Sequence, residues 1–331
     1  MPLPEGEAVG RYILRRTLIN IPVIWLILTL VFFATSVLPG DFVAQRIAQQ
    51  NPTGNTKAER DAQVQAIRKE LGVDKPVVQR YVDYVGNTLK GDLGHSFRTK
   101  QPALQVFREG LPYTLQLALM TLFVALVTSI PIGIISAVKQ DTPIDYALRV
   151  TAIAGVAAPS FWVATILLLS VVRYRLWNID LIGQPLLWED PVGSMKLYIL
   201  PAIAGGFASG AGIMRLLRSQ MLEVLRQDYI RTAWAKGLRE RGIIVRHALK
   251  NAMIPVLTVI GLTIAGLISG NVVFEYLFGI PGLGSRVLSA ITQRDVPVVQ
   301  AFVLVIATFV VFVNLAVDVL YGWLDPRIRY S

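Results

Sequence analysis

The densest polar chemistry in the sequence lies in residues 215–250. Nine Lys or Arg stand there against three Asp or Glu, and a long apolar segment flanks the stretch on each side. Apolar residues recur within it at helical spacing: Ile230, Ala233, Trp234 and Leu238. A loop that is basic only because it faces the cytoplasm would explain the charge, but not this spacing or the small residues Ala233, Ala235 and Gly237. The stretch therefore predicts a basic helix with a small-residue surface that another protein could approach closely.

The residue types for most catalytic or metal chemistry are absent. The chain has no cysteine, which excludes disulfides, iron–sulfur clusters and thiolate metal sites. Its two histidines, His95 and His247, are far apart, so neither a metal centre nor histidine-based catalysis is expected. No GxxxxGK[ST] phosphate-binding loop occurs. The glycines of GIPGLGSR, residues 279–286, indicate turns in a short re-entrant loop. Glu275 just before them is expected to face a vestibule or water.

The elements that must position this chemistry are membrane spans. The chain is 53% hydrophobic and 16% charged, whereas a soluble domain is about 25% charged. Six segments lack charge over a spanning length: Thr17–Gly40, Gly110–Val138, Val150–Val172, Leu197–Met214, Asn251–Phe274 and Val296–Val317. The fourth is the shortest, and we expect its helix to continue past Arg215. Close helix packing explains most glycines in these spans.

Orientation follows from the Lys and Arg residues of the short connections. They concentrate on the side of the N-terminus and of residues 215–250, which predicts that both termini are cytoplasmic. The net charge of +10 lies between apolar spans and forms no continuous basic face for nucleic acid. The first apolar run is longer than a signal-peptide core of about 7–15 residues, so residues 1–40 are expected to be a retained anchor.

Residues 41–109 are expected to form a small extracytoplasmic segment. Asp74 and Pro76 predict the start of a helix, and four apolar residues continue it at helical spacing. Val64, Ile67 and Leu71 suggest an earlier helix.

The phrases DYIRTAWAKGL, residues 228–238, and RHALKNAMIP, residues 246–255, carry a family resemblance. They resemble the cytoplasmic coupling loop of ABC-importer permeases of the dipeptide, oligopeptide and nickel family. Of that loop's general pattern, Ala233, Gly237 and Leu249 match strictly. The departures at the other positions are typical of the peptide-transporting branch. GLPYTLQLAL, residues 110–119, and LDPRIRY, residues 324–330, extend the resemblance over almost all of the chain.

The resemblance implies an all-α integral membrane permease, with one N-terminal span, a five-helix core in residues 110–331 and a cytoplasmic coupling helix. It implies a multi-pass protein of a prokaryotic cytoplasmic membrane that is not itself an enzyme and holds no metal or cofactor. Two separate ABC ATPase subunits would bind ATP and Mg²⁺. A second permease subunit, usually a different chain, and an extracytoplasmic substrate-binding protein would complete the importer.

The resemblance places the coupling residues at Asp228, Tyr229, Arg231, Thr232, Ala233, Ala235, Lys236, Gly237 and Leu238, with Arg231–Leu238 as the docking helix. Ala233 and Gly237 would allow the ATPase to approach closely. Gly237 could instead adopt a positive φ. Arg231 and Lys236 would pair with acidic residues of the ATPase. Polar residues that could line a pathway are Ser160, Thr258, Thr263, Ser269, Asn271 and Asn314. A peptide substrate is expected. Nickel or glutathione import by the same family, or a stand-alone secondary carrier, remain alternatives.

Overall fold

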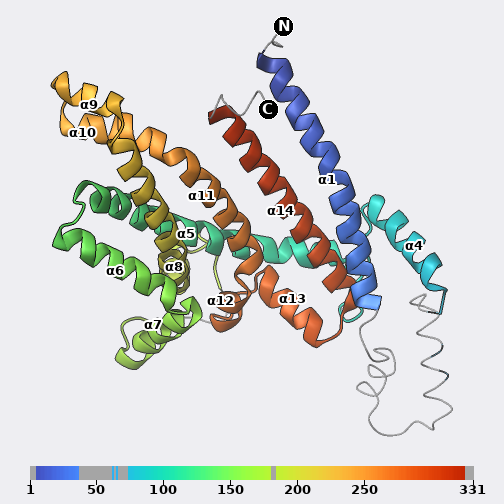
Figure 1. Cartoon of the computed structure of the whole chain (residues 1–331). Helices are drawn as coiled ribbons and strands as arrows, with labels where there is room; N and C mark the ends of the chain where they lie inside the picture. Colours follow the sequence, from blue (N-terminus) through green and yellow to red (C-terminus); the bar gives the residue numbers. More distant parts are fainter. Residues whose placement is uncertain (1–4, 37–61, 63–64, 66–73, 180–183, 325–331) are drawn as a thin grey trace. The chain divides into compact units, whose positions relative to one another are not determined.

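A computed structural model describes residues 5–36, 62, 65, 74–179 and 184–324 (Figure 1). Within these residues the regular structure is helical, with a single isolated β-bridge between His95 and Pro102. The longer helices are α1 (Glu5–Ser36), α4 (Val77–Leu89), α5 (Ala103–Val138), α6 (Pro143–Ala157), α7 (Ser160–Tyr174), α8 (Pro191–Leu225), α11 (Lys250–Gly270) and α14 (Val296–Leu324). The shorter ones are α9 (Asp228–Ala235), α10 (Glu240–Gly242), η1 (Ile243–Leu249), α12 (Val272–Leu277) and α13 (Leu283–Thr292).

The described residues confirm an all-α membrane architecture. Five helices are long and apolar enough to cross a membrane, and a sixth span results if α6 and α7 count as one broken segment. The predicted extension of the fourth span is also confirmed, because α8 runs without interruption to Leu225. The predicted helix after Asp74 is α4, which begins directly after Pro76. The earlier helix suggested by Val64, Ile67 and Leu71 lies outside the described residues, as does most of residues 41–73.

The third predicted span is not one straight helix. Residues 150–172 contain a break at which α6 and α7 meet at 96°. Ala158 and Pro159 are both extended there, with ψ of 127° and 124°. A residue before proline is pushed out of the helical region, and proline has no N–H to continue the hydrogen-bond ladder. The apolar run is thus long enough for a span, but its helix is broken at Ala158 and Pro159.

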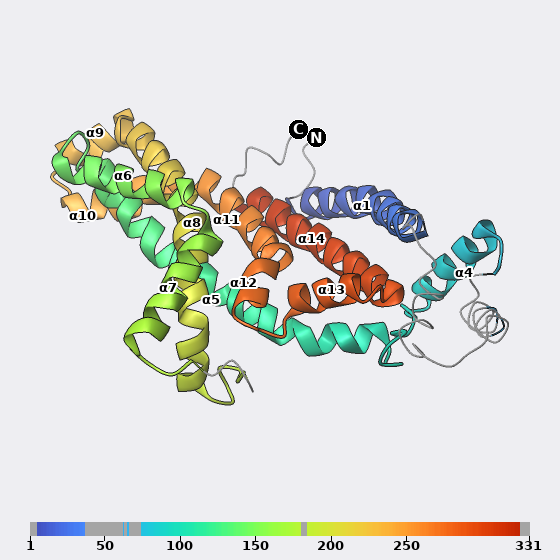
Figure 2. The same cartoon turned by 90° about the horizontal axis from the view of Figure 1, so that it is seen from below.

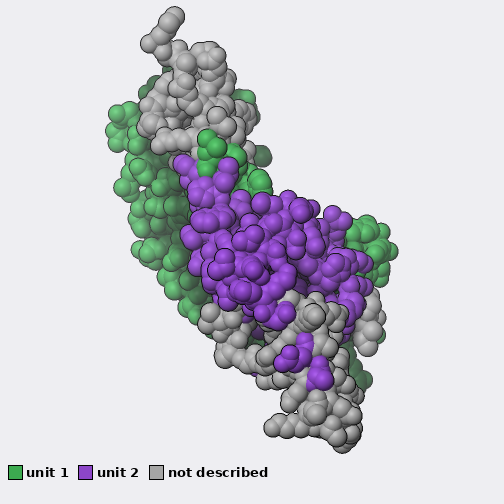
Figure 3. All heavy atoms as spheres, turned by 90° about the vertical axis from the view of Figure 1, so that its right-hand side faces the viewer, with its two compact units in different colours: residues 1–18, 109–286, 309–331 green, residues 19–108, 287–308 purple. Residues whose placement is uncertain are grey.

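The chain divides into two compact units, coloured separately in Figure 3. The second unit comprises residues 19–108 and 287–308. In it, Tyr81 of α4 hydrogen-bonds Thr29 of α1 at 2.7 Å and stacks against the aromatic rings of that helix. Asp295 accepts hydrogen bonds from Ser96 Oγ at 2.5 Å and from Phe97 N at 2.9 Å. These contacts join the segment after α4 to the start of α14.

The first unit comprises residues 1–18, 109–286 and 309–331, and its helices α5 and α8 pack closely. A Cβ on Gly206 would lie 2.8 Å from Thr121 O, and one on Gly210 would lie 2.9 Å from Ala125 O. These two glycines therefore let the helix backbones approach, as small residues do in membrane helix pairs. Gly212, in contrast, has open space where a Cβ would stand, so close packing does not explain every glycine of α8.

Candidate functional site

The basic segment forms a short helix, α9, that follows α8 after two residues. We predicted a docking helix from Arg231 to Leu238, but the helix occupies Asp228–Ala235, three residues earlier. Gly237 has a φ of +72°, and its amide donates to Trp234 O at 2.9 Å. A residue in this left-handed conformation is a common helix end, and glycine adopts it without steric cost. The predicted special role of Gly237 is therefore a backbone role that ends the helix.

One side of α9 is part of this chain's own core. Ile230 is fully buried and Ala233 is 7% exposed. Both belong to a hydrophobic cluster that also contains Leu217 and Met221 of α8 and Ile243 of η1. The expectation that Ala233 keeps a partner-facing surface small is therefore wrong, because its methyl group packs inside this chain. Its small size instead lets α9 lie close to its supports.

The rest of the surface of α9, together with the residues just after it, is exposed and combines apolar with basic groups. Tyr229, Trp234 and Leu238 are each close to half exposed. Ala235 and Lys236 are also exposed. The four residues predicted as one apolar side are thus divided, with Ile230 and Ala233 inside and Trp234 and Leu238 outside. Exposed aromatic and aliphatic groups gathered in one place are common at interaction surfaces.

Two further candidates on α9 have partners within the chain. Arg231 pairs with Asp228 at 3.5 Å, and both side chains are largely exposed. Such a pair is worth only about 0–1 kcal/mol, so Arg231 can exchange it for a carboxylate on another protein. Thr232 Oγ1 donates to Asp228 O at 3.0 Å, which stabilises the first turn.

The segment after α9 is a π-helix, η1, which the sequence did not indicate. It covers seven residues, Ile243–Leu249, and continues into α11. It packs against α8, α9 and α10, and Figures 1 and 2 show the four elements together at one end of this unit. Asn251 at the start of α11 donates to Tyr229 Oη at 2.8 Å. π-helical turns often accompany functional sites.

Glu275 of α12 is buried, contrary to the expectation that it faces a vestibule or water. Its side chain accepts hydrogen bonds from Thr114 Oγ1 at 2.6 Å and from Ser285 N at 2.9 Å. A Cβ on Gly282 would overlap the Glu275 carboxyl group, and one on Gly284 would lie 2.6 Å from Val272 Cα. The glycines of the predicted re-entrant loop therefore leave room for the backbone to wrap around a carboxylate.

The pKa of Glu275 reflects this enclosure. Burial raises the pKa, because the charged form loses hydration, while the donors from Thr114 and from the Gly284 and Ser285 amides act in the opposite direction. Burial dominates. Glu275 lies within α12, which stands in the sequence between the candidate membrane spans of α11 and α14.

The described hydrogen bonds do not connect the predicted pathway residues to one another. Asn271 is 4% exposed, and its side-chain nitrogen has no hydrogen-bond partner in the part of the chain that is described. Thr258 and Thr263 are half-buried on α11, and Thr263 Oγ1 donates to Val259 O at 2.8 Å. Ser160 is the half-buried first residue of α7, and Asn314 is exposed on α14. The side chain of Ser269 lies outside the described residues.

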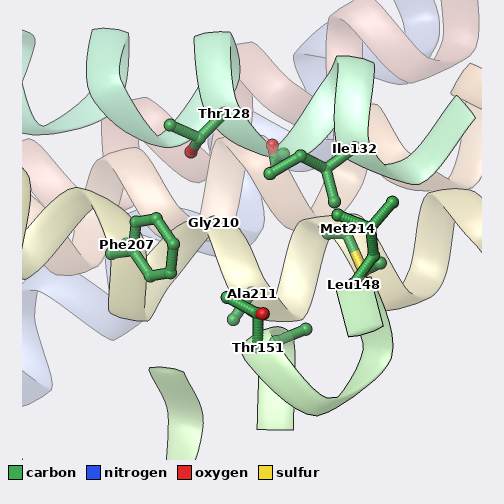
Figure 4. Close-up of a pocket in the computed structure, with 10 residues that line it drawn as sticks. Thr128, Ile132, Leu148, Thr151, Phe207, Gly210, Ala211 and Met214 are labelled. Atoms are coloured by element: carbon green, nitrogen blue, oxygen red, sulfur yellow. The ribbon is translucent and has the colours of Figure 1, made fainter. Parts of the chain in front are cut away.

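A small pocket opens between α5, α6 and α8 (Figure 4). Its lining is mostly apolar and includes Ile132, Leu148, Phe207 and Met214. None of the predicted pathway residues reaches it. Among the described residues, no group of three His, Cys, Asp or Glu side chains could hold a metal ion.

Two family descriptions together match nearly the whole chain. Residues 129–330 match the binding-protein-dependent transport system inner membrane component, and residues 9–118 match the N-terminal region of that membrane component.

Three curated relatives match the chain almost from end to end. The dipeptide transport system permease protein DppB of Escherichia coli is 38% identical, and the protein of the same name from Haemophilus influenzae is 40% identical. The di/tripeptide transport system permease protein DppB of Pseudomonas aeruginosa is 38% identical. Each comparison covers 97% of this chain and 99% of the relative.

Proposed function

Because this chain belongs to the family of binding-protein-dependent transport system inner membrane components, we propose that it is the peptide-conducting permease subunit of an ABC importer. Similarity over 97% of the chain to dipeptide and di/tripeptide permeases is the observation that carries the proposal. The substrate class is short peptides. The chain acts as a transport subunit and not as an enzyme, and the ATP that drives it is bound and hydrolysed by separate subunits.

The proposed importer contains five proteins. A second permease subunit pairs with this chain, two cytoplasmic ABC ATPases dock beneath the pair, and an extracytoplasmic binding protein delivers the peptide. Both termini and α9 face the cytoplasm, in line with the distribution of Lys and Arg. ATP binding closes the ATPases, and the permease pair rocks from an inward-open to an outward-open state.

α9 is the proposed coupling helix, and its contacts support this role. Its inner side, through Ile230 and Ala233, is anchored in the permease core. Tyr229 and Trp234 on its exposed surface, and Leu238 just after its end, are available to a partner. Lys236 adds a positive charge that suits acidic groups on an ATPase. A helix that is anchored on one side and exposed on the other can transmit a push, whereas a helix without buried contacts would swing freely.

Six polar residues remain proposed contributors to the peptide pathway: Ser160, Thr258, Thr263, Ser269, Asn271 and Asn314. Of these, Asn271 has the most informative environment, because its buried amide nitrogen lacks a partner in the described chain. An unsatisfied buried donor is costly unless another group or water reaches it. A peptide carbonyl passing this point would supply an acceptor.

Uptake by the assembled importer in proteoliposomes tests the function. Radiolabelled dipeptide should accumulate only with the binding protein outside and ATP at the ATPases, and excess unlabelled dipeptide should compete. Nickel and glutathione, offered as competitors and as labelled substrates, address the other substrates of this family. Accumulation of nickel or glutathione in place of dipeptide would contradict the peptide assignment. Dipeptide uptake without ATP would instead indicate a secondary carrier.

A further inference from the structure

A buried ion pair joins α6 to α8 in the first unit. Asp145 has no exposed surface, and Arg218 holds it with two hydrogen bonds, from Nε to Oδ1 at 2.9 Å and from Nη2 to Oδ2 at 2.7 Å. Two parallel bonds of this kind restrict both distance and orientation between the planar groups. The two residues are 73 positions apart in the sequence, and neither of them was singled out from the sequence.

The same carboxylate also holds the turn between α5 and α6. Ser136 Oγ near the end of α5 donates to Asp145 Oδ1 at 2.5 Å, and the Asp141 amide donates to Oδ2 at 3.1 Å. Thr142 caps α6 by accepting from the Asp145 amide. The Asp145 side chain is therefore a shared acceptor for the end of α5, the turn and α8. All of its strong donors come from the protein, so it needs no solvent.

Arg218 lies close to the part of α8 that leads into α9. α8 ends at Leu225 and α9 begins at Asp228. Leu217 and Met221, on either side of Arg218, belong to the cluster that buries Ile230 of α9. Figure 1 shows α9 and the α5–α6 turn at the same end of the unit. A displacement of α9 would thus reach Arg218 through packed side chains and reach α6 through the ion pair.

We propose that the Asp145–Arg218 pair is a positioning link that transmits movement of α9 to α6 and to the end of α5. The inference rests on the proposed function, because it assigns a route by which ATPase motion reaches the spans. Hydrophobic contacts can slide past one another, whereas a buried two-bond ion pair resists both separation and rotation. The pair would make the end of α8 and the start of α6 move as one body.

Arg149 provides a matched control. It lies 4.0 Å from Asp145 Oδ2, but it stands on α6 itself, four residues along, and its side chain is 44% exposed. It therefore contacts the same carboxylate without joining two helices. Arg149→Ala should leave the ratio of ATP hydrolysed to peptide imported within about twofold of the parent value, as expected for an exposed pair.

The test compares this ratio among assembled importers in proteoliposomes, with complex abundance measured for each. The double variant Asp145→Asn with Arg218→Met removes the link without leaving an unpaired buried charge, and the asparagine oxygen still accepts from Ser136. It should assemble and hydrolyse ATP, but consume about fivefold more ATP per peptide or worse, the lower end of typical coupling between sites. Arg218→Lys keeps the charge and loses the two-bond fork, so it should give an intermediate ratio.

An unchanged ratio per assembled complex in the double variant would overturn the link. Failure of that variant to assemble would also overturn it, because the pair would then serve folding alone. A parent complex without ATP-dependent uptake would instead contradict the proposed function on which the inference depends.

Discussion

Substitutions at Gly237 measure how much the end of α9 depends on glycine. The residue has a φ of +72°, and no atom lies within 4 Å of the position that a Cβ would occupy. Alanine therefore meets no clash, and its cost is backbone strain of roughly 1–2 kcal/mol. If docking requires the native turn, a cost of this size lowers the population of the docked conformation by a factor of roughly 5–30. Asparagine tolerates the left-handed region better than alanine, so Gly237→Asn should lose less.

Tryptophan at the same position separates strain from contact with a partner. Gly237→Trp carries a strain similar to that of alanine, and no atom of this chain lies within 4 Å of the position of its Cβ. We attribute any loss beyond that of Gly237→Ala to contact between the indole ring and a neighbouring protein. We expect Gly237→Trp to bind the ATPase more weakly than Gly237→Ala does, because the proposed coupling surface lies directly beside the residue.

The assay is a titration of purified ATPase subunits onto the permease pair in nanodiscs, with transport measured in parallel. Gly242→Ala is the control, because Gly242 has an ordinary helical φ of −66° and open space for a Cβ, so alanine there adds no strain. The expected order of affinity is parent, Asn, Ala and Trp, with the control like the parent. Equal affinity for Gly237→Trp and the parent would refute α9 as the docking element. Equal affinity for Asn and Ala would refute the strain argument.

Further measurements address topology, the buried carboxylate and the anchoring of α9. A thiol reagent that cannot cross membranes should label Asn55→Cys in intact cells and spare Ser331→Cys. The reverse labelling pattern would invert the proposed orientation. The parent chain has no cysteine to interfere. Glu275 has a folded-state pKa raised above 4.5 by burial, so its contribution to stability is fully present below that pH and falls as pH rises through the raised pKa. The melting temperature of the parent should thus decline relative to Glu275→Gln as the pH approaches neutrality, and parallel melting profiles would count against this assignment. Ile230→Ala should destabilise the α9 region by about 2–5 kcal/mol because the side chain is fully buried, seen as faster amide exchange there, and unchanged exchange would show that the core contact is dispensable. Lys236→Ala, at an exposed position, should cost ATPase binding only about 0–1 kcal/mol, so a loss of transport would point to a buried ion pair in the complex.

Hydropathy and backbone chemistry made several elements predictable from the sequence. The membrane spans follow from charge-free length, and the start of α4 follows from Pro76, because both depend on residues close together in the chain. The continuation of α8 beyond Arg215 and the positive φ of Gly237 also depend on residues close together in the chain. Local sequence therefore determined where helices form and where α9 can end.

Tertiary packing decided which groups face each other. Helical spacing placed Ile230 and Trp234 on one side of α9, but only the position of α8 and η1 determined that the first is buried and the second exposed. The enclosure of Glu275 depends on a donor from Thr114, and the burial of Asp145 depends on Arg218. Hydropathy counts each of these residues as a charge that favours water. The environment of each carboxylate, however, is made by partners that are distant in the sequence. A single sequence does not show which distant residues come into contact.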